Sequence, residues 1–283
     1  MESIVEYFNN IPSAHRSAIL IGGITLFMLI ETGIPLFRKP YNRWSHTGLN
    51  IFFTFTTIVI NFLMASILFY GSEWAEAKGF GILNWLPSMP LWLEMIAGLL
   101  LLDLIGAYFV HWTEHKVKWM WRFHLIHHTD PNVDTTTANR HHPGESVFRF
   151  VFTAAGAVVA GAPWWIIMMY QSMSAALSQF NHANIRFPKN LDQILSYVIV
   201  TPGMHRIHHH YVQPYTDSNY GNIFAIWDRL FGTYMHIDNE KLIYGIDTYM
   251  KPEEHSNLKR LLTIPFEKYR PPVGGKFYGD EQE

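Results

Sequence analysis

Three long apolar runs lie within the first 110 residues of the chain. They cover residues 17–37, 49–70 and 91–110. A helix needs about 20 apolar residues to span a bilayer, so each run predicts a transmembrane helix. A fourth apolar region, 147–180, is interrupted at Gly161 and Pro163. Because proline restricts the residue before it and suits the start of a helix, this region predicts a hairpin of two helices.

The rest of the chain is more polar and contains no further run of that length. Residues 1–16 are expected to form an N-terminal segment and residues 236–283 a cytosolic C-terminal tail, on either side of one membrane-embedded domain at 17–235. The pattern therefore predicts an all-α fold, an integral membrane bundle of helices.

Charges in the short loops predict the orientation of this bundle. The connection at 38–44 carries three basic residues, whereas 71–79 carries two acids and one base. Because basic loops stay in the cytoplasm, loop 38–46 is expected inside and the 71–90 connection outside. The third span and the hairpin then return to the cytoplasmic side, which receives every clustered histidine.

Composition supports the membrane assignment and excludes several classes of function. The chain is 49% hydrophobic and only 16% charged, against a usual charged share of about 25%. A net charge of −2 without any Lys/Arg-rich run argues against nucleic acid as a partner. The absence of cysteine excludes disulfides, thiolate zinc sites and iron–sulfur clusters.

Histidine is the residue in excess, with 16 copies concentrated in a few places. Three arrays have helical spacing: His111 with His115; His124 with His127 and His128; and His205 with His208 and His209. Residues three and four apart share a helix face, so each array is expected to point its imidazoles at one spot. Eight histidines exceed the ligands of one zinc ion and imply at least two metal ions. Eight buried imidazoles without ligands would be costly near a membrane.

Two short motifs and one further class of protein offer alternatives. HWTEH at 111–115 fits the zinc-protease pattern in which Glu114 would activate water, but this explains neither the other arrays nor the spans. HHPGE at 141–145 is similar to the haem motif of cytochrome b5 domains but lacks its second glycine. A zinc transporter should carry ligands inside its spans, yet 17–37 and 49–70 contain no histidine.

The order HxxxH, HxxHH and a distant HxxHH resembles the fatty acid hydroxylase superfamily, which includes sterol desaturases, sterol C4-methyl oxidases and alkylglycerol monooxygenase. The resemblance covers roughly residues 30–235 and rests on HWTEH, FHLIHHTDP and TPGMHRIHHHY, with TTTANRHHP, FNHANIRFP and DSNYGNIFAIWDRLFGTY around them. Two departures are Trp112, where an arginine is common, and the additional His210.

The resemblance implies a non-haem di-iron oxidoreductase with a histidine-rich dimetal cap on the cytosolic ends of the helices. Such an enzyme uses O₂ and two electrons to hydroxylate an unactivated C–H bond of a lipid; a lipid desaturase with the same centre is the nearest alternative, and a zinc-dependent membrane hydrolase is another. Zinc could replace iron in the purified protein. No flavin, iron–sulfur or b5-type segment is recognisable, so a separate donor of the ferredoxin or cytochrome b5 type, with its reductase, is expected to supply the electrons.

The resemblance also implies roles for individual residues. His142 is expected to be a ligand with His141 as a bystander. The full expected ligand set is His111, His115, His124, His127, His128, His142, His182, His205, His208 and His209. Residues expected to orient the ligands, or to hold a bridging water between them, are Asp103, Glu114, Asp130, Asn181, Asn184, Asp217 and His210.

Two expectations concern the surroundings of the site. Lys116, Lys118 and Arg122 lie on the cytoplasmic side, where they could help an acidic electron donor to dock, although solvated helix charges explain them equally well. The closing residues GDEQE contain no clear retention signal, which favours a bacterial inner membrane over the endoplasmic reticulum.

Overall fold

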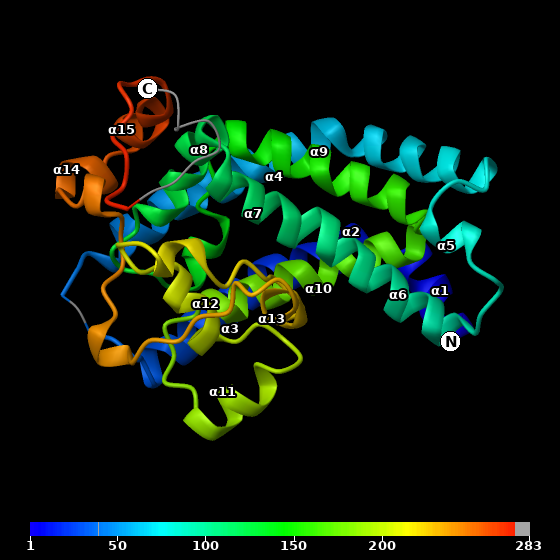
Figure 1. The fold of residues 1–283 in the computed structure, drawn as a ribbon, viewed down its shortest axis with the longest axis horizontal. Coiled ribbons are helices and arrows are strands. Elements are labelled where there is room, and N and C mark those ends of the chain that lie inside the picture. Colours follow the sequence, from blue (N-terminus) through cyan, green and yellow to red (C-terminus); the bar gives the residue numbers. More distant parts are fainter. Residues whose placement is uncertain (39, 275–283) are drawn as a thin grey trace.

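The computed structural model describes residues 1–38 and 40–274. Lys39 of the basic loop and the closing GDEQE therefore lie outside the described residues. The described chain is helical and contains no β-sheet, only three isolated β-bridges. In Figure 1 the long helices run along the long axis of the molecule, and short helices gather with the C-terminal segment at one end. We call this end the cap.

Three helical stretches are long and apolar enough to cross a membrane, namely Ser13–Gly33, Arg43–Trp85 and Leu91–Lys116. They confirm the three spans expected at the beginning of the chain and make this a multi-pass membrane protein. The first comprises α2 (Ser13–Ser17), a π-helical turn and α3 (Gly23–Gly33); the second comprises α4 (Arg43–Ala77) and α5 (Ile82–Trp85). The side chain of Phe62, near the middle of α4, is 80% exposed, as a lipid-facing position would be.

The third span carries the first histidines on its final turns. It comprises α6 (Leu91–Asp103), a π-helical segment at Leu104–Phe109 and α7 (Val110–Lys116). π-Helical turns inside α-helices often occur at functional sites, and this one directly precedes His111. The spans place loop 34–42 and the histidines at the cap, and the 78–90 connection at the opposite end beside the N-terminal helix α1 (Glu2–Asn9) (Figure 1).

The interrupted apolar region forms α9 (Pro143–Ala160) and α10 (Trp164–His182). Neither is among the three candidate spans. α10 runs through the bundle and packs against α1, α3, α4, α6 and α12 (Pro202–His208). Its last residue, His182, therefore reaches the cap from inside the bundle.

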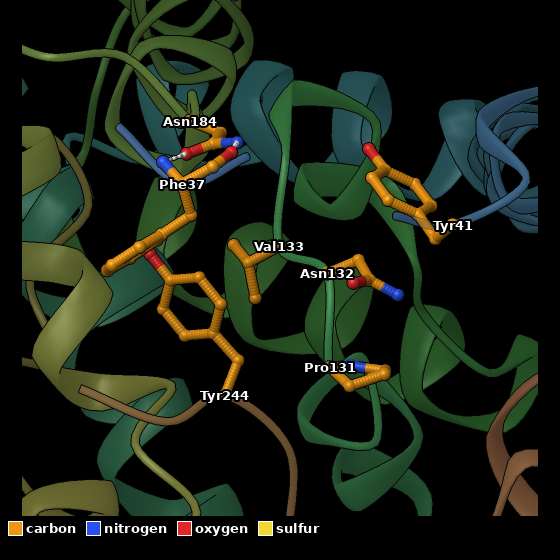
Figure 2. A pocket seen from close by; sticks show the side chains of 7 residues that line it. All are labelled: Phe37, Tyr41, Pro131, Asn132, Val133, Asn184 and Tyr244. Atoms are coloured by element: carbon orange, nitrogen blue, oxygen red, sulfur yellow. Dashed lines mark hydrogen bonds between the residues drawn. The ribbon is translucent and has the colours of Figure 1, made fainter. Parts of the chain in front are cut away.

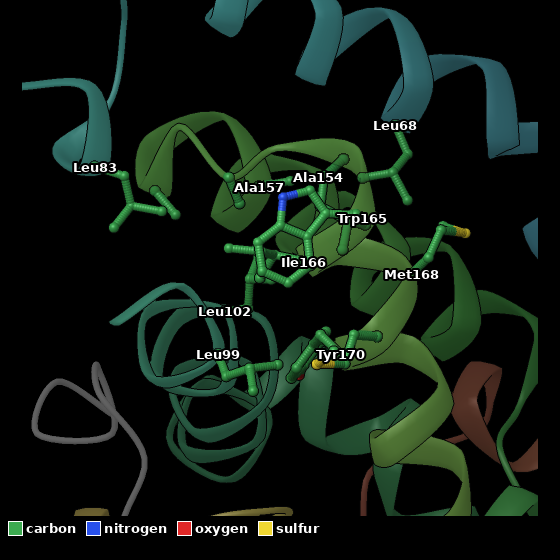
Figure 3. Close-up of a cluster of buried hydrophobic side chains, with 14 of the residues drawn as sticks. Leu68, Leu83, Leu99, Leu102, Ala154, Ala157, Trp165, Ile166, Met168 and Tyr170 are labelled. Carbon is green, nitrogen blue, oxygen red and sulfur yellow. The ribbon is translucent and has the colours of Figure 1, made fainter. Parts of the chain in front are cut away.

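The main hydrophobic core lies where α4, α6, α9 and α10 meet. Figure 3 shows the Trp165 indole among side chains of these four helices. Ile166 and Ile167 of α10 and Ala157 of α9 are fully buried there. Apolar packing within the bundle therefore holds α10, the helix that ends at His182.

Two buried charged residues fasten the cap to the spans. Glu31 of α3 accepts hydrogen bonds from the backbone amides of Thr135 (2.8 Å) and Asn184 (2.9 Å) and pairs with Arg43. The buried Arg140 donates to four acceptors in three segments, which are the Ile126 carbonyl and Thr129 Oγ1 at the end of α8 (Lys118–His128), Asn50 Oδ1 and the His255 carbonyl. The cap is thus cross-linked to α3 and α4 through hydrogen bonds rather than by apolar packing alone.

The turn between α9 and α10 depends on a glycine. Gly161 has φ of 64°, and a Cβ added to it would lie 2.5 Å from Asn84 Nδ2 and 2.7 Å from the Phe80 carbonyl. Gly79 has a similar φ of 58° but open space around it. Alanine substitutions at these two glycines therefore separate the free-energy cost of a positive φ from the cost of a steric clash.

We predict that Gly161→Ala destabilises the protein more than Gly79→Ala. Both should lose about 1–2 kcal/mol for an alanine at positive φ, and Gly161→Ala should lose about 1–3 kcal/mol more for overpacking. Thermal unfolding in detergent, followed by circular dichroism, measures the difference. Equal losses for the two variants would contradict the close contact between this turn and residues 80–84.

Candidate metal centre

Nine buried histidines from four helices meet in the cap. Ring nitrogens of one group lie within 4.8 Å of one another and belong to His111, His115, His124, His128 and His208. We call this the five-histidine group. A four-histidine group, defined in the same way, consists of His127, His182, His205 and His209. The two groups adjoin, since the ring centroids of His128 and His209 are 5.0 Å apart.

Each HxxHH array is divided between the two groups. On α8 (Lys118–His128), His124 and His128 join the five-histidine group and His127 the other. At α12, His205 and His209 join the four-histidine group and His208 the other. The expectation that each array points at one spot is therefore corrected. Positions i and i+4 share a face, whereas adjacent residues diverge by about 100° around a helix of 3.6 residues per turn.

One short segment, residues 217–220, orients three rings of the five-histidine group. Asp217 Oδ1 lies 3.1 Å from Nδ1 of His115. The Ser218 carbonyl lies 2.7 Å from Nδ1 of His208, and the Tyr220 carbonyl lies 2.8 Å from Nδ1 of His111. A ring nitrogen that faces an acceptor carries the proton, so Nε2 of each ring keeps a free lone pair. These three Nε2 atoms are buried and have no hydrogen-bond partner in the described structure.

Buried side chains hold this segment in place. Asp228 accepts hydrogen bonds from the backbone amides of Tyr220 (2.8 Å) and Gly221 (2.9 Å). Asp103, in the third span, accepts from the amides of Ile223 and Phe224 and from the indole of Trp227. Asp103 thus holds the residues that follow the segment and does not contact a histidine directly. It fixes residues 223–227 to the span that carries His111.

The four-histidine group is built around His182. Its Nδ1 faces the Ser178 carbonyl (2.8 Å) and Asn181 Oδ1 (2.7 Å). Its Nε2 lies 3.0 Å from Nε2 of His205 and 3.2 Å from Nε2 of His127. One lone pair cannot accept hydrogen bonds from two rings in good geometry. Two nitrogens bound to one ion at about 2.1 Å lie roughly 3 Å apart, so these contacts suit a shared ion.

A carboxylate on α9, that of Glu145, contacts the rings of two histidines in the cap. Glu145 Oε1 lies 2.7 Å from Nδ1 of His124 and 2.6 Å from Nδ1 of His141, and it also accepts from Arg149. Arg149 forms a bidentate pair with Glu114 at 2.7 and 3.0 Å. Glu114 is buried and lies 3.5 Å from Nδ1 of His124. Because the guanidinium occupies both oxygens of Glu114, this carboxylate is poorly placed to activate water as a protease base.

Burial keeps the clustered imidazoles neutral. The pKa values of His205, His208 and His209 lie well below the ordinary value, mainly because burial removes water from the rings. Electrostatic repulsion from the neighbouring histidines lowers them further. Burial alone would raise the pKa of Asp217, but its contacts with His115 and Lys116 lower it. Neutral imidazoles and an ionised orienting carboxylate are the forms that metal binding requires. The residues therefore fit two metal ions, one in each group.

The structure leaves His142 outside both groups. Its Nδ1 accepts from the Gly144 amide at the start of α9, and its Nε2 lies 3.3 Å from the Leu262 carbonyl. Its neighbour His141 turns toward the centre and stacks on His127, with ring centroids 4.8 Å apart. His142 was expected at the centre and His141 beside it, and the structure has the opposite arrangement. The reason is that His142 is the residue that begins the helix. His141 itself is hydrogen-bonded at both nitrogens, to Glu145 and to the Ala138 carbonyl.

Other residues expected near the ligands are placed elsewhere. Asp130 pairs with His46 and accepts from Thr137. His210 lies outside both groups and accepts from the Ile243 amide. Asn184 exchanges hydrogen bonds of 3.0 Å with the amide and carbonyl of Phe37, as Figure 2 shows. The cavity beside it holds only about 10 Å³, so Asn184 fastens the chain after the first span.

Several orienting groups were not recognised in the sequence. Glu145 belongs to the HHPGE motif, and its distance of four residues from His141 is the one signal that could have revealed it. The carbonyls of Ser178, Ser218 and Tyr220 are backbone atoms, so no residue type marks them. Asn181 and Asp217, which do contact ligand rings, were among the expected residues.

The fold and the site define a multi-pass helical membrane protein with a histidine-lined centre suited to two metal ions. Residues 95–233, just under half of the chain, match the sequence model of the fatty acid hydroxylase family. This region begins in α6 and includes all nine grouped histidines. No solved structure matches the chain significantly.

The curated relatives are named as lipid hydroxylases and monooxygenases. Ornithine lipid hydroxylase OlsE from Rhizobium tropici is 28% identical over 151 residues, which cover 53% of this chain and 44% of that protein. Human alkylglycerol monooxygenase is 28% identical over 50% of this chain and 30% of its own length. A cholesterol 25-hydroxylase-like protein from Danio rerio is 29% identical over 50% and 55%. The matched region thus spans about half or less of these relatives.

We predict that the two groups lose metal independently. The double variant His182→Ala/His205→Ala leaves two ligands in the four-histidine group and should retain about one metal ion per chain where the unaltered protein binds about two. Elemental analysis of the detergent-purified protein measures this ratio. His142→Asn is the matched control, because asparagine preserves the helix cap and should leave both ions bound. Loss of an ion from His142→Asn would show that His142 is a ligand.

Proposed function

We propose that the chain is an O₂-dependent di-iron oxidoreductase that hydroxylates an unactivated C–H bond of a lipid. The observation that carries this proposal is the pair of adjoining groups of buried histidines, whose ring nitrogens converge. Imidazole suits iron among other transition metals. Bound iron would supply the activation of O₂. The overall reaction consumes two electrons and two protons and yields one alcohol and one water.

The protein residues position and protect this chemistry. We assign His111, His115, His124, His128 and His208 to one ion, and His127, His182, His205 and His209 to the other. Asp217, Asn181 and Glu145 orient rings by accepting from their Nδ1 atoms. The burial of the nine rings excludes water from the reacting region.

Three observations favour lipid hydroxylation over the alternatives. The relatives reported above are named as hydroxylases and monooxygenases rather than desaturases. The pairing of Glu114 with Arg149 disfavours a zinc hydrolase that uses this carboxylate as its base. The candidate spans bring the site next to a bilayer, from which a lipid can enter.

The electrons have to come from a separate donor protein of the ferredoxin or cytochrome b5 type. The three basic residues considered for its docking already have partners within the chain. Lys116 pairs with Asp217, Lys118 lies over the Tyr269 ring, and Arg122 donates to the Glu267 carbonyl. The structure therefore gives these three residues local roles.

Isotope labelling tests the proposed reaction. Membranes that contain the protein, a reductase with its donor, and mixed lipids should form a lipid alcohol with one ¹⁸O atom from ¹⁸O₂ and none from H₂¹⁸O. The double variant His182→Ala/His205→Ala should form none. An unlabelled alkene would indicate desaturation. A product that takes its oxygen from water, without reductant, would indicate a hydrolase.

We also propose that the centre faces the cytoplasm, as the charges of the loops suggest, and that the membrane is a bacterial inner membrane. Because the chain has no cysteine, single substitutions report the side of the membrane. Lys78→Cys lies at the end opposite the cap and should react with a membrane-impermeant maleimide in intact spheroplasts. Glu253→Cys, exposed on the cap, should react only after the membrane is opened. The reverse pattern would overturn this orientation.

A further inference from the structure

A second cavity lies beside the metal centre, between α11 (Lys189–Leu195), α12 and the chain near residue 236. Its volume is about 260 Å³, close to the lower end of the range for small-molecule sites, which is about 300–1,000 Å³. Polar and charged side chains dominate its walls. They include Lys189, Asp192, Arg206, His236, Asp238 and Asn239.

The guanidinium of Arg206 is buried in this wall without a counter-charge. Arg206 is only 5% exposed. The acceptors of its hydrogen bonds are neutral: the Pro202 carbonyl at 2.7 Å, and the Ile185 carbonyl and Asn239 Oδ1 at 3.4 Å. No carboxylate of the described residues forms an ion pair with it. A buried charge is costly unless it is paired, and the two long contacts leave its Nη atoms free to bind an anion more tightly.

The other charged groups of the cavity define what kind of anion fits. Lys189 is exposed at the cavity wall and adds a second positive charge. Asp192 is engaged by the Gly203 amide at 3.0 Å, and Asp238 remains as a negative group. The lining therefore suits a headgroup that combines an acid group with a hydrogen-bond donor.

One wall of the cavity is formed by α11 and the turn that follows it, residues 189–198, which together have a polar and an apolar side. Asp192, Gln193 and Ser196 line the cavity. The apolar side chains of Ile194 and Val198 point away and are 67% and 62% exposed. A short helix with one polar and one apolar face is typical of the interface between lipid and water. In Figure 1 α11 projects from the side of the bundle near the cap, where lipid headgroups would lie.

The cavity also adjoins the four-histidine group. Met204 and Arg206 line it, and both flank His205 on α12. We propose that this cavity binds the acid group, phosphate or carboxylate, of a polar lipid headgroup, with Arg206 as its counter-charge. This inference rests on the proposed function and names its substrate class. A headgroup held here would present the polar end of the lipid, rather than the end of its acyl chain, to the metal centre.

Binding of short-chain lipids to the metal-loaded protein in detergent tests this proposal without enzymatic turnover. The probes are dihexanoyl phosphatidic acid, an N-acyl amino acid and neutral dihexanoylglycerol, with inorganic phosphate as a fourth ligand. We expect one or both acidic lipids to bind at least about 10-fold more tightly than the neutral lipid. Arg206→Gln should remove that preference. Lys189→Gln should weaken it about threefold through a screened charge.

The matched control is Arg186→Gln, which removes an exposed cation on the same segment that does not line the cavity. It should keep the preference unchanged. If Arg206→Gln does not fold, the lipid preferences of Lys189→Gln and Arg186→Gln can still be compared to test the proposal. Equal affinity for acidic and neutral lipids, equal effects of Lys189→Gln and Arg186→Gln, or inorganic phosphate binding as tightly as the lipids would each overturn the proposal.

The outcome is independent of the proposed reaction. Selective binding of acidic lipids without ¹⁸O incorporation would retain the headgroup site and reject the oxygenase. Incorporation of ¹⁸O with no headgroup preference would retain the oxygenase and reject this site.

Discussion

The hydrogen-bonding capacity of nine buried imidazoles is the constraint on which the cap depends. Each ring has two nitrogens that lose water on folding, and a buried polar atom left without a partner costs about 1–3 kcal/mol. Acceptors from the chain satisfy one nitrogen of His111, His115 and His208 and leave the other without a partner. Metal ions bound to these free nitrogens would complete this arrangement, and folding of the cap would then be coupled to metal binding.

The acceptors come from parts of the chain that are distant in sequence. Residues 217–220 orient rings on α7 and α12, and Glu145 of α9 orients a ring on α8. The span helices determine where these parts meet, because Asp103 holds the segment that follows residue 220 and Glu31 holds the segment before α9. A polar network buried in this way has to be complete to be stable. This requirement explains why several buried carboxylates accept hydrogen bonds from backbone amides.

Features of the site that depend on local spacing could be predicted from the sequence, whereas features that depend on tertiary contacts could not. The spacings within 111–115, 124–128 and 205–209 predicted the clusters because helical periodicity is a local property. The division of each HxxHH array between two groups follows from the same periodicity, once adjacent residues are seen to diverge. The positions of His141 and His142 depended on which one begins a helix, and His-Pro alone did not decide it. Asp130 and Asn184 were expected to orient the ligands. In the structure Asp130 instead pairs with His46, and Asn184 accepts a hydrogen bond from the Phe37 amide.

Iron K-edge X-ray absorption of the iron-loaded, detergent-purified protein tests the central claim most directly, because it reports the ligands themselves. The account predicts about two irons per chain, with a first shell dominated by imidazole nitrogen and four to five histidines available to each ion. A first shell dominated by carboxylate oxygen, or a protein that binds no iron while its helices remain folded, would contradict it.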